Sequence, residues 1–406
     1  MPLIEKAVAK LNGSYESLIA GQTVEGLSTL TGYPCDSVRL EPNSHANEDE
    51  IDLEMIWARL LSMKEAGYAM GASCGRSEIK DDLIFTNKGL LPRHAYSVLN
   101  VKEINGNQLI QLRNPWGRYT WTGDWSENSA KWTPELRKAL GVKPRSGKGA
   151  QPTSYSQNDN HFYNQNSSYR NSDQGVFWMS FNDFVQYFCS IDICKTRLDW
   201  FESRISGYFN AEGTREMQAY HLVVFETSEI DIGLFHKTVK NRRENSDLDL
   251  CFVVLRSNGE RNSVGKLVLS SKHSVRKFIG AEHIFEPGEY IIVPFSFNFW
   301  YTGNSSIRDS GSREDGKNTT NNLYNLVIHS PKVFFLEQEM HAAFLLADTI
   351  IQLCISKGGK TYSGLENACI YTLTKGFAGI VVVAENLNER TYLHVELDCE
   401  RWVLCF

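Results

Sequence analysis

The stretches His94-Ala-Tyr-Ser-Val98 and Asn114-Pro-Trp-Gly117 lie at the two open ends of a predicted β-hairpin. Apolar and β-branched residues over 96–104 and 108–113 indicate its two strands, and Asn105-Gly106 between them is a strong hairpin-turn signal. A hairpin brings the start of its first strand close to the end of its second strand. The imidazole of His94 and the carboxamide of Asn114 are therefore expected to meet in space.

The register of this hairpin is a sharper prediction. A two-residue turn at 105–106 places Asn114 opposite Ser97, and His94 then points to the other face because side chains alternate along a strand. An odd-length turn or a β-bulge between residues 94 and 114 restores a common face. We predict such an irregularity, and a regular hairpin with the two side chains on opposite faces would contradict their pairing.

A histidine oriented by an asparagine can be the acid–base group of a catalytic site whose other part is a nucleophile. A thiolate attacks a carbonyl carbon, and a histidine keeps the sulfur ionised and later protonates the leaving amine. An asparagine oxygen can orient that histidine without adding a charge. Taken alone, a histidine before a strand is usually an ordinary core or surface residue and Asn-Pro-Trp-Gly is usually a turn, so the pattern by itself does not decide the function.

Bulk properties restrict the class of protein. The 406 residues predict two to four domains, and 42% hydrophobic with 12% aromatic residues is a globular composition. A net charge of −6 gives no indication of nucleic-acid binding. No apolar run has the roughly eighteen residues of a membrane helix, and the N-terminus does not resemble a signal peptide. Nine scattered cysteines without a CxxC pair favour a reducing compartment, so we expect a cytoplasmic protein.

The pattern along the chain indicates a multidomain, mainly β protein with some α-helix. Helices are predicted over 2–11 and 52–66, and a polar stretch over 143–175 is predicted to be a disordered surface insertion. Strand-length apolar runs over 198–300 predict an antiparallel β-sandwich. Residues 302–322 form a polar linker. Residues 323–406, with a helix predicted over 337–355, are expected to be a small separate α+β domain.

Residues 1–195 resemble the second half of the calpain protease core, the second lobe of a papain-like fold. Residues 198–300 are similar to the C2-like module of calpains, and residues 323–406 resemble the C-terminal domain of the small-optic-lobes subgroup. The segments that carry the protease resemblance follow the order of the family motifs: Glu5-Lys-Ala-Val-Ala-Lys-Leu-Asn-Gly-Ser-Tyr-Glu16, Gly89-Leu-Leu-Pro-Arg-His-Ala-Tyr-Ser-Val98, Arg113-Asn-Pro-Trp-Gly117, Trp121-Thr-Gly-Asp-Trp-Ser126 and Phe177-Trp-Met-Ser-Phe181.

This resemblance implies an intracellular calpain-type cysteine endopeptidase, a thiol protease that performs limited proteolysis of protein substrates. It implies that His94 is the acid–base residue and Asn114 the residue that orients it. It further implies that the indole of Trp116 covers the hydrogen bond between them. Neither a nucleic-acid partner nor a transmembrane segment is expected.

The nucleophile is where the sequence departs from the family. Calpains carry it upstream in a Cys-Trp pair, and none of the nine cysteines here precedes a tryptophan. Cys74 is expected in a buried strand and Cys35 in a turn, so neither fits the role. We expect a chain that begins inside the protease core and is inactive alone. The alternative is a catalytically inactive calpain-like binding or regulatory protein.

Calcium is a second departure. Conventional calpains bind calcium in this lobe, and the matching positions here are Thr120, Glu127, Gln174 and Val176. Glu127 retains a carboxylate, with Asp124 and Asp173 nearby as substitutes, whereas calcium favours several carboxylate oxygens. We therefore assign no cofactor and expect at most weak calcium binding at Glu127, Asp124 and Asp173.

Overall fold

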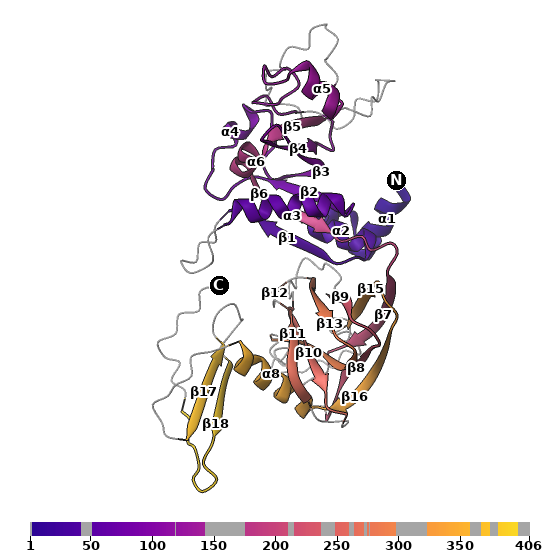
Figure 1. Cartoon of the computed structure of the whole chain (residues 1–406), viewed down its shortest axis with the longest axis vertical. Coiled ribbons are helices and arrows are strands. Elements are labelled where there is room, and N and C mark those ends of the chain that lie inside the picture. Colours follow the sequence, from indigo (N-terminus) through magenta and orange to yellow (C-terminus); the bar gives the residue numbers. More distant parts are fainter. Residues whose placement is uncertain are drawn as a thin grey trace, which may run out of the picture. The chain divides into compact units, whose positions relative to one another are not determined.

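The computed structural model describes residues 2–41, 51–117, 119–142, 175–209, 215–236, 248–259, 264–271, 274–275, 277–297, 323–357, 367–373 and 381–396. The chain divides into two compact units, residues 21–196 and residues 1–20 together with 197–406 (Figure 1). The predicted linker over 302–322, and all of the predicted insertion over 143–175 except Gly175, lie outside the described residues.

The unit 21–196 is built on a six-stranded antiparallel sheet with the strand order β1-β6-β2-β3-β4-β5. Its strands are β1 (Cys35–Arg39), β2 (Ala69–Cys74), β3 (His94–Ile104), β4 (Asn107–Arg113), β5 (Val176–Ser180) and β6 (Phe188–Cys194). Its helices are α2 (Thr23–Thr31), α3 (Leu53–Glu65), α4 (Asp82–Thr86), α5 (Pro134–Leu140) and α6 (Phe181–Tyr187).

Helix α3 confirms the helix predicted over 52–66. The Asp52 carboxylate accepts the backbone N–H of Met55 at 2.9 Å, which caps the helix start. Gly67 follows the helix with φ 75°, a left-handed conformation that glycine adopts without strain. The helix buries Trp57 and Leu60 in the main core of this unit.

Both faces of the sheet are covered near β4. Ile110 and Leu112 belong to the main core, whereas Leu109 points to the other face and joins a second cluster. In this second cluster the rings of Trp125 and Trp132 pack edge-to-face with centroids 4.9 Å apart. The β3–β4 hairpin is therefore fixed by packing on both of its sides, which gives its ends a defined position.

The other unit begins with α1 (Pro2–Leu11) and a 3₁₀ turn over Tyr15–Leu18, and its main body is a β-sandwich. One sheet has the order β11-β10-β14-β8-β16 with β12 paired to β10, and the other has the order β13-β9-β15-β7. The strands are β7 (Phe201–Tyr208), β8 (Glu216–Val224), β9 (Ser228–His236), β10 (Asp249–Ser257), β11 (Val264–Ser270), β12 (Ser274–Val275), β13 (Phe278–Phe285), β14 (Gly288–Ser296), β15 (Leu323–Ser330) and β16 (Phe334–Ala342).

The expectation of a separate α+β domain over 323–406 is wrong for its first part. Strand β15 pairs with β7 and β9, and β16 pairs with β8, so both strands complete the sandwich. The helix predicted over 337–355 is also displaced: β16 extends to Ala342, and the helix is α8 (Phe344–Ser356). The first residues of the predicted helix belong to a strand, and its pairing partner lies more than a hundred residues earlier in the chain, where no local pattern identifies it.

The remaining C-terminal elements form a third layer on the sandwich. Helix α8 covers the outer face of the β10/β14 sheet, and the hairpin of β17 (Ala368–Leu373) and β18 (Val381–Asn386) packs against α8, which lies between the sandwich and the hairpin (Figure 1). Leu345 and Leu353 of α8 belong to the same hydrophobic cluster as Val253 and Val293 of the sheet. Because these strands are buried on both faces, they read as continuous apolar runs and do not alternate.

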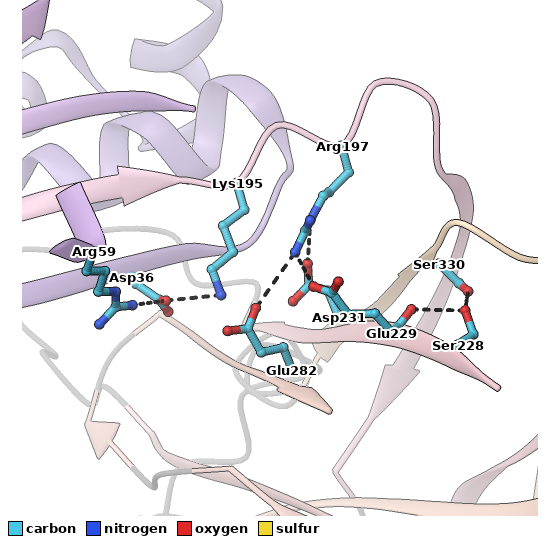
Figure 2. Close-up of polar contacts among 9 residues, drawn as sticks. All are labelled: Asp36, Arg59, Lys195, Arg197, Ser228, Glu229, Asp231, Glu282 and Ser330. Carbon is cyan, nitrogen blue, oxygen red and sulfur yellow. Dashed lines mark hydrogen bonds and ion pairs between the residues drawn. The ribbon is translucent and has the colours of Figure 1, made fainter. Parts of the chain in front are cut away.

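Arg197, at the start of the sandwich unit, is held by three carboxylates (Figure 2). Its guanidinium lies 2.9 Å from Asp231, 2.7 Å from Glu229 and 3.7 Å from Glu282, and it stacks 3.9 Å above the Trp200 ring. Within the described ranges, these carboxylates are the one group of three metal-ligand side chains close enough to share a cation. The guanidinium is that cation in this structure.

Replacing Arg197 with methionine is expected to lower the free energy of unfolding by about 3–5 kcal/mol, because it removes the cation beside a buried carboxylate. Asp231 is only 1% exposed. Urea denaturation of the full chain measures the effect. Lys332→Met is the matched control, since the Lys332–Glu226 pair is exposed and should contribute less than about 1 kcal/mol. Equal losses from the two variants would contradict this account.

Candidate active site

The β3–β4 hairpin contains the predicted irregularity. From Ile104 opposite Asn107 to Asn100 opposite Gln111 the register is that of a two-residue turn, and it then shifts so that Val98 lies opposite Leu112. Leu99 is the extra residue of this β-bulge. The prediction is confirmed, and the shift brings His94 and Asn114 to a common face.

His94 is the first residue of β3 and Asn114 directly follows β4. Nε2 of His94 lies 3.1 Å from Oδ1 of Asn114. The carboxamide is fully buried and the imidazole is half-buried. The structure therefore joins the two residues in one hydrogen bond.

Two backbone groups fix the orientation of the Asn114 carboxamide. Its Oδ1 accepts the backbone N–H of Trp116 at 3.0 Å, and its Nδ2 donates to the carbonyl oxygen of Tyr119 at 3.2 Å. Because Oδ1 can only accept, Nε2 of His94 must carry the proton in their shared hydrogen bond. In the neutral ring the lone pair then lies on Nδ1, which becomes the atom that can take a proton from a nucleophile.

Two aromatic rings hold the imidazole. The Trp116 ring lies 4.6 Å from the His94 ring at 57°, and the Tyr96 ring packs edge-to-face at 5.4 Å. Trp116 is 67% exposed, so it is not a core residue. Tyr96 is buried, and its hydroxyl accepts the backbone N–H of Leu91 at 2.9 Å. The histidine is thus fixed on its inner side by Tyr96 and covered by Trp116.

The segment before His94 is fitted closely to the loop after Asn114. Gly89 has φ 75°, and a Cβ at this position would overlap the carbonyl oxygen of Thr120. Any larger residue would push away the loop that contains Tyr119, whose carbonyl holds Asn114. This close approach explains the glycine at the start of the histidine motif.

Sequence reasoning missed part of the site. The Tyr119 carbonyl and the Trp116 N–H are backbone groups, and no side-chain pattern marks them. Tyr96 could have been found, because residues 94 and 96 share a face of a strand.

Cys74 and Cys35, the two cysteines weighed as nucleophiles, do not have the position that a nucleophile beside His94 requires. Cys74 is the register partner of His94 on β2, but it is buried, its thiol donates to the Tyr187 carbonyl at 3.7 Å, and burial raises its pKa well above the ordinary thiol value. Cys35 lies on β1, and β6 and β2 separate β1 from β3, a span of about 14 Å at ordinary strand spacing. Neither thiol is placed to serve His94 as a thiolate.

The three calcium candidates do not form a cluster among the described residues. Asp124 forms an ion pair with Lys131 at 2.8 Å, and Glu127 is exposed. Asp173 lies outside the described residues. Within the described ranges, neither Asp124 nor Glu127 belongs to a group of three metal-ligand side chains close enough to share a cation.

Comparison with known proteins bears on the same segments. Residues 1–164 match the sequence profile described as calpain family cysteine protease, and residues 353–405 match the profile described as calpain-D-like, C-terminal domain. Residues 1–164 are thus similar to the calpain family cysteine proteases.

Two individual calpains match about half of this chain, and the match covers only a small part of each of them. A calpain-type cysteine protease DEK1 of Arabidopsis thaliana is 31% identical over 225 residues, which is 54% of this chain and 9% of that protein. The human calpain-1 catalytic subunit is 34% identical over 224 residues, which is 52% of this chain and 26% of that protein. The match thus spans about a tenth of the length of the first relative and about a quarter of the length of the second.

Comparison with solved structures adds nothing to the fold assignment. A crystal structure of the pre-peptidase C-terminal domain of collagenase from Bacillus anthracis covers 32% of this chain and 89% of that chain, at 15% identity and a TM-score of 0.20. A likeness of this size is too slight to bear on the fold. Among the described residues, no helix is both long and apolar enough to cross a bilayer.

Proposed function

We propose that this chain supplies the acid–base half of a calpain-type cysteine endopeptidase that acts on proteins in the cytoplasm. The hydrogen bond between His94 and Asn114 carries the proposal, because it leaves Nδ1 of an accessible imidazole as the basic atom. A thiolate from a first lobe would pair with Nδ1. After attack on the scissile carbonyl, the imidazolium would give the Nδ1 proton to the leaving amine.

The experiment is complementation. The full chain is combined with a calpain first lobe that carries the nucleophilic cysteine, either as a fusion or by co-expression, and hydrolysis of a fluorogenic peptide is measured. We expect turnover that neither part shows alone and that iodoacetamide abolishes. The control is the same first lobe with its cysteine replaced by alanine. If an assembled and folded complex shows no turnover, the chain is better described as an inactive calpain-like binding or regulatory protein.

Replacing the exposed indole of Trp116 should change the rate of the reaction but not the stability of the fold. We expect Trp116→Ala to lower kcat/KM of the complemented enzyme by about three- to tenfold, since an aromatic contact contributes about 0.5–1.5 kcal/mol. Urea unfolding should change by no more than about 0.5 kcal/mol. Trp132→Ala is the contrasting variant, because this buried ring should cost about 3–5 kcal/mol of stability. A large loss of stability from Trp116→Ala would assign the ring to the core instead.

Calcium binding by this lobe is proposed to be weak. The carboxylate of Asp124 already has Lys131 as its partner, and the exposed Glu127 offers one carboxylate where calcium favours several oxygen ligands. Isothermal titration of the full chain with calcium, compared with an Asp124→Asn and Glu127→Gln double variant, measures this directly. We expect no low-micromolar site that the double substitution removes. Such a site would contradict the proposal.

The β-sandwich is proposed to orient the protease lobe as a C2-like module. Its carboxylate group of Glu229, Asp231 and Glu282 is engaged by Arg197, an internal cation, which supports a structural use of these side chains.

A further inference from the structure

Two buried thiols face each other where the first and last strands of the 21–196 unit meet. Cys35 begins β1 and Cys194 ends β6, and the two are register partners in an antiparallel ladder. The next pair along the ladder is hydrogen-bonded, since the N–H of Lys195 donates to the carbonyl of Pro34 at 2.9 Å. Cys35 and Cys194 therefore occupy a non-hydrogen-bonded position, where partner Cα atoms lie about 4.5 Å apart. A disulfide spans Cα separations of about 4.4–6.8 Å.

Salt bridges hold the register of this ladder. Lys195, which follows Cys194, lies 3.1 Å from the carboxylate of Asp36, which follows Cys35 (Figure 2). Arg59 of α3 binds the same carboxylate at 2.9 Å. The Lys195 side chain is only 5% exposed, so this contact is largely shielded from solvent. The two thiols are thus kept opposite each other by the residues next to them.

The surroundings make the two thiols unequal. A hydrogen bond from Cys35 lowers the pKa of Cys194 to about 7, and the Thr31 hydroxyl lies 3.2 Å from the Cys194 sulfur. The same thiol pair raises the pKa of Cys35, since the second proton is held once the first has left. Burial raises the pKa of Cys74, Cys189 and Cys251. Cys194 is therefore the thiol with most thiolate character among these five cysteines.

We propose that Cys35 and Cys194 are a redox-active dithiol that a peroxide oxidises to a disulfide, locking β1 to β6. The Cys194 thiolate attacks one peroxide oxygen and the O–O bond breaks, which gives a sulfenic acid on Cys194 and, after protonation, one water. The sulfur of Cys35 then attacks the Cys194 sulfur, the S–O bond breaks, and the hydroxyl leaves with the Cys35 proton as a second water. Two thiols lose two electrons in total, and hydrogen peroxide gains them.

Burial sets the rate of this chemistry. Cys194 is fully buried and Cys35 is 5% exposed, so reaction with peroxide is expected to be slower than at an exposed thiol. Strand β1 lies at the edge of the sheet and pairs with β6 alone among the described strands, so local opening there is the proposed route of access. The oxidant must therefore be small enough to reach the thiols through this local opening.

The test uses the full chain, fully reduced and then exposed to hydrogen peroxide. Free thiols are blocked with iodoacetamide, and mass spectrometry locates any bridge. We expect a linked pair of peptides containing Cys35 and Cys194, two hydrogens lighter than the reduced pair and restored by dithiothreitol. The thermal midpoint should rise on oxidation, because the bridge joins residues far apart in the sequence. Alkylation of both residues as free thiols after peroxide treatment, or a bridge to a different cysteine, would overturn the proposal.

Single substitutions distinguish the role of Cys194, which attacks the peroxide, from that of Cys35, which resolves the sulfenic acid. In Cys35→Ser the sulfenic acid on Cys194 has no resolving thiol, so dimedone should label Cys194 (expected) rather than leave it unmodified (contradicting the proposal). In Cys194→Ser the thiol of Cys35 should stay reduced under the same conditions. Cys189→Ser is the control and should form the Cys35–Cys194 bridge as the unmodified chain does. The measurement on the unmodified chain decides the matter if a variant does not fold.

Discussion

Replacing His94 with alanine is expected to lower kcat/KM of the complemented enzyme by about 10⁴-fold, the upper range for loss of a general acid–base group. The ring keeps a partner sulfur ionised and returns its proton to the leaving amine, and both steps need the Nδ1 atom that Asn114 leaves free. The half-buried ring contributes less to packing than a core side chain does, so the variant should fold. Steady-state hydrolysis of a fluorogenic peptide measures the effect.

His283→Ala is the matched control for this substitution. His283 is exposed on β13 of the sandwich and should leave the rate unchanged. The acid–base role of His94 would be contradicted if His94→Ala kept a tenth or more of the activity while the complex remained assembled.

The second large effect is expected for Asn114. We expect Asn114→Ala to lower kcat/KM by about 10²-fold, because an imidazole released from its acceptor loses both its orientation and its tautomer. Asn114 is fully buried, and its removal also leaves the Trp116 N–H and the Tyr119 carbonyl without this partner. A loss of stability of about 1–3 kcal/mol should therefore accompany the loss of rate.

Asn114→Asp distinguishes orientation from simple damage to the core. A carboxylate still accepts the Nε2 proton but adds a negative charge beside the ring, and this charge favours the imidazolium over the neutral ring. The active form requires the imidazolium. The added charge should therefore move the alkaline limb of the pH–rate profile of Asn114→Asp to higher pH than in the unmodified enzyme. An unmoved alkaline limb would mean that residue 114 does not act through His94.

The sequence predicted the site more fully than the arrangement of the domains. Side chains alternate between the two faces of the β3–β4 hairpin, so His94 and Asn114 can share a face only if the register between them is irregular. The structure places this irregularity at Leu99. This inference worked because strand alternation is a local rule that depends only on neighbouring residues. The Tyr119 carbonyl, by contrast, is a backbone group set by a loop conformation, which residue types do not specify.

The C-terminal region shows why long-range pairing was missed. Strand β16 pairs with β8, and β15 inserts between β7 and β9, so both partners come from far earlier in the chain. Propensity and periodicity describe one segment at a time and do not identify such partners. The continuous apolar runs over 250–255 and 290–295 did contain a signal, because a sandwich strand with one solvent face would alternate. That signal indicates a third layer, which α8 provides, and the β17–β18 hairpin packs against α8.

The central claim is that Asn114 holds the proton on Nε2 of His94 and leaves Nδ1 as the base. The most direct test is nitrogen NMR of the full chain with ¹⁵N-labelled histidine at about pH 8.5, well above the ordinary imidazole pKa of about 6.5. His94→Gln assigns the His94 signals. The account predicts a protonated Nε2 and an unprotonated Nδ1 for His94, with this preference lost in Asn114→Ala. A proton on Nδ1, or a tautomer that does not respond to Asn114→Ala, would contradict it.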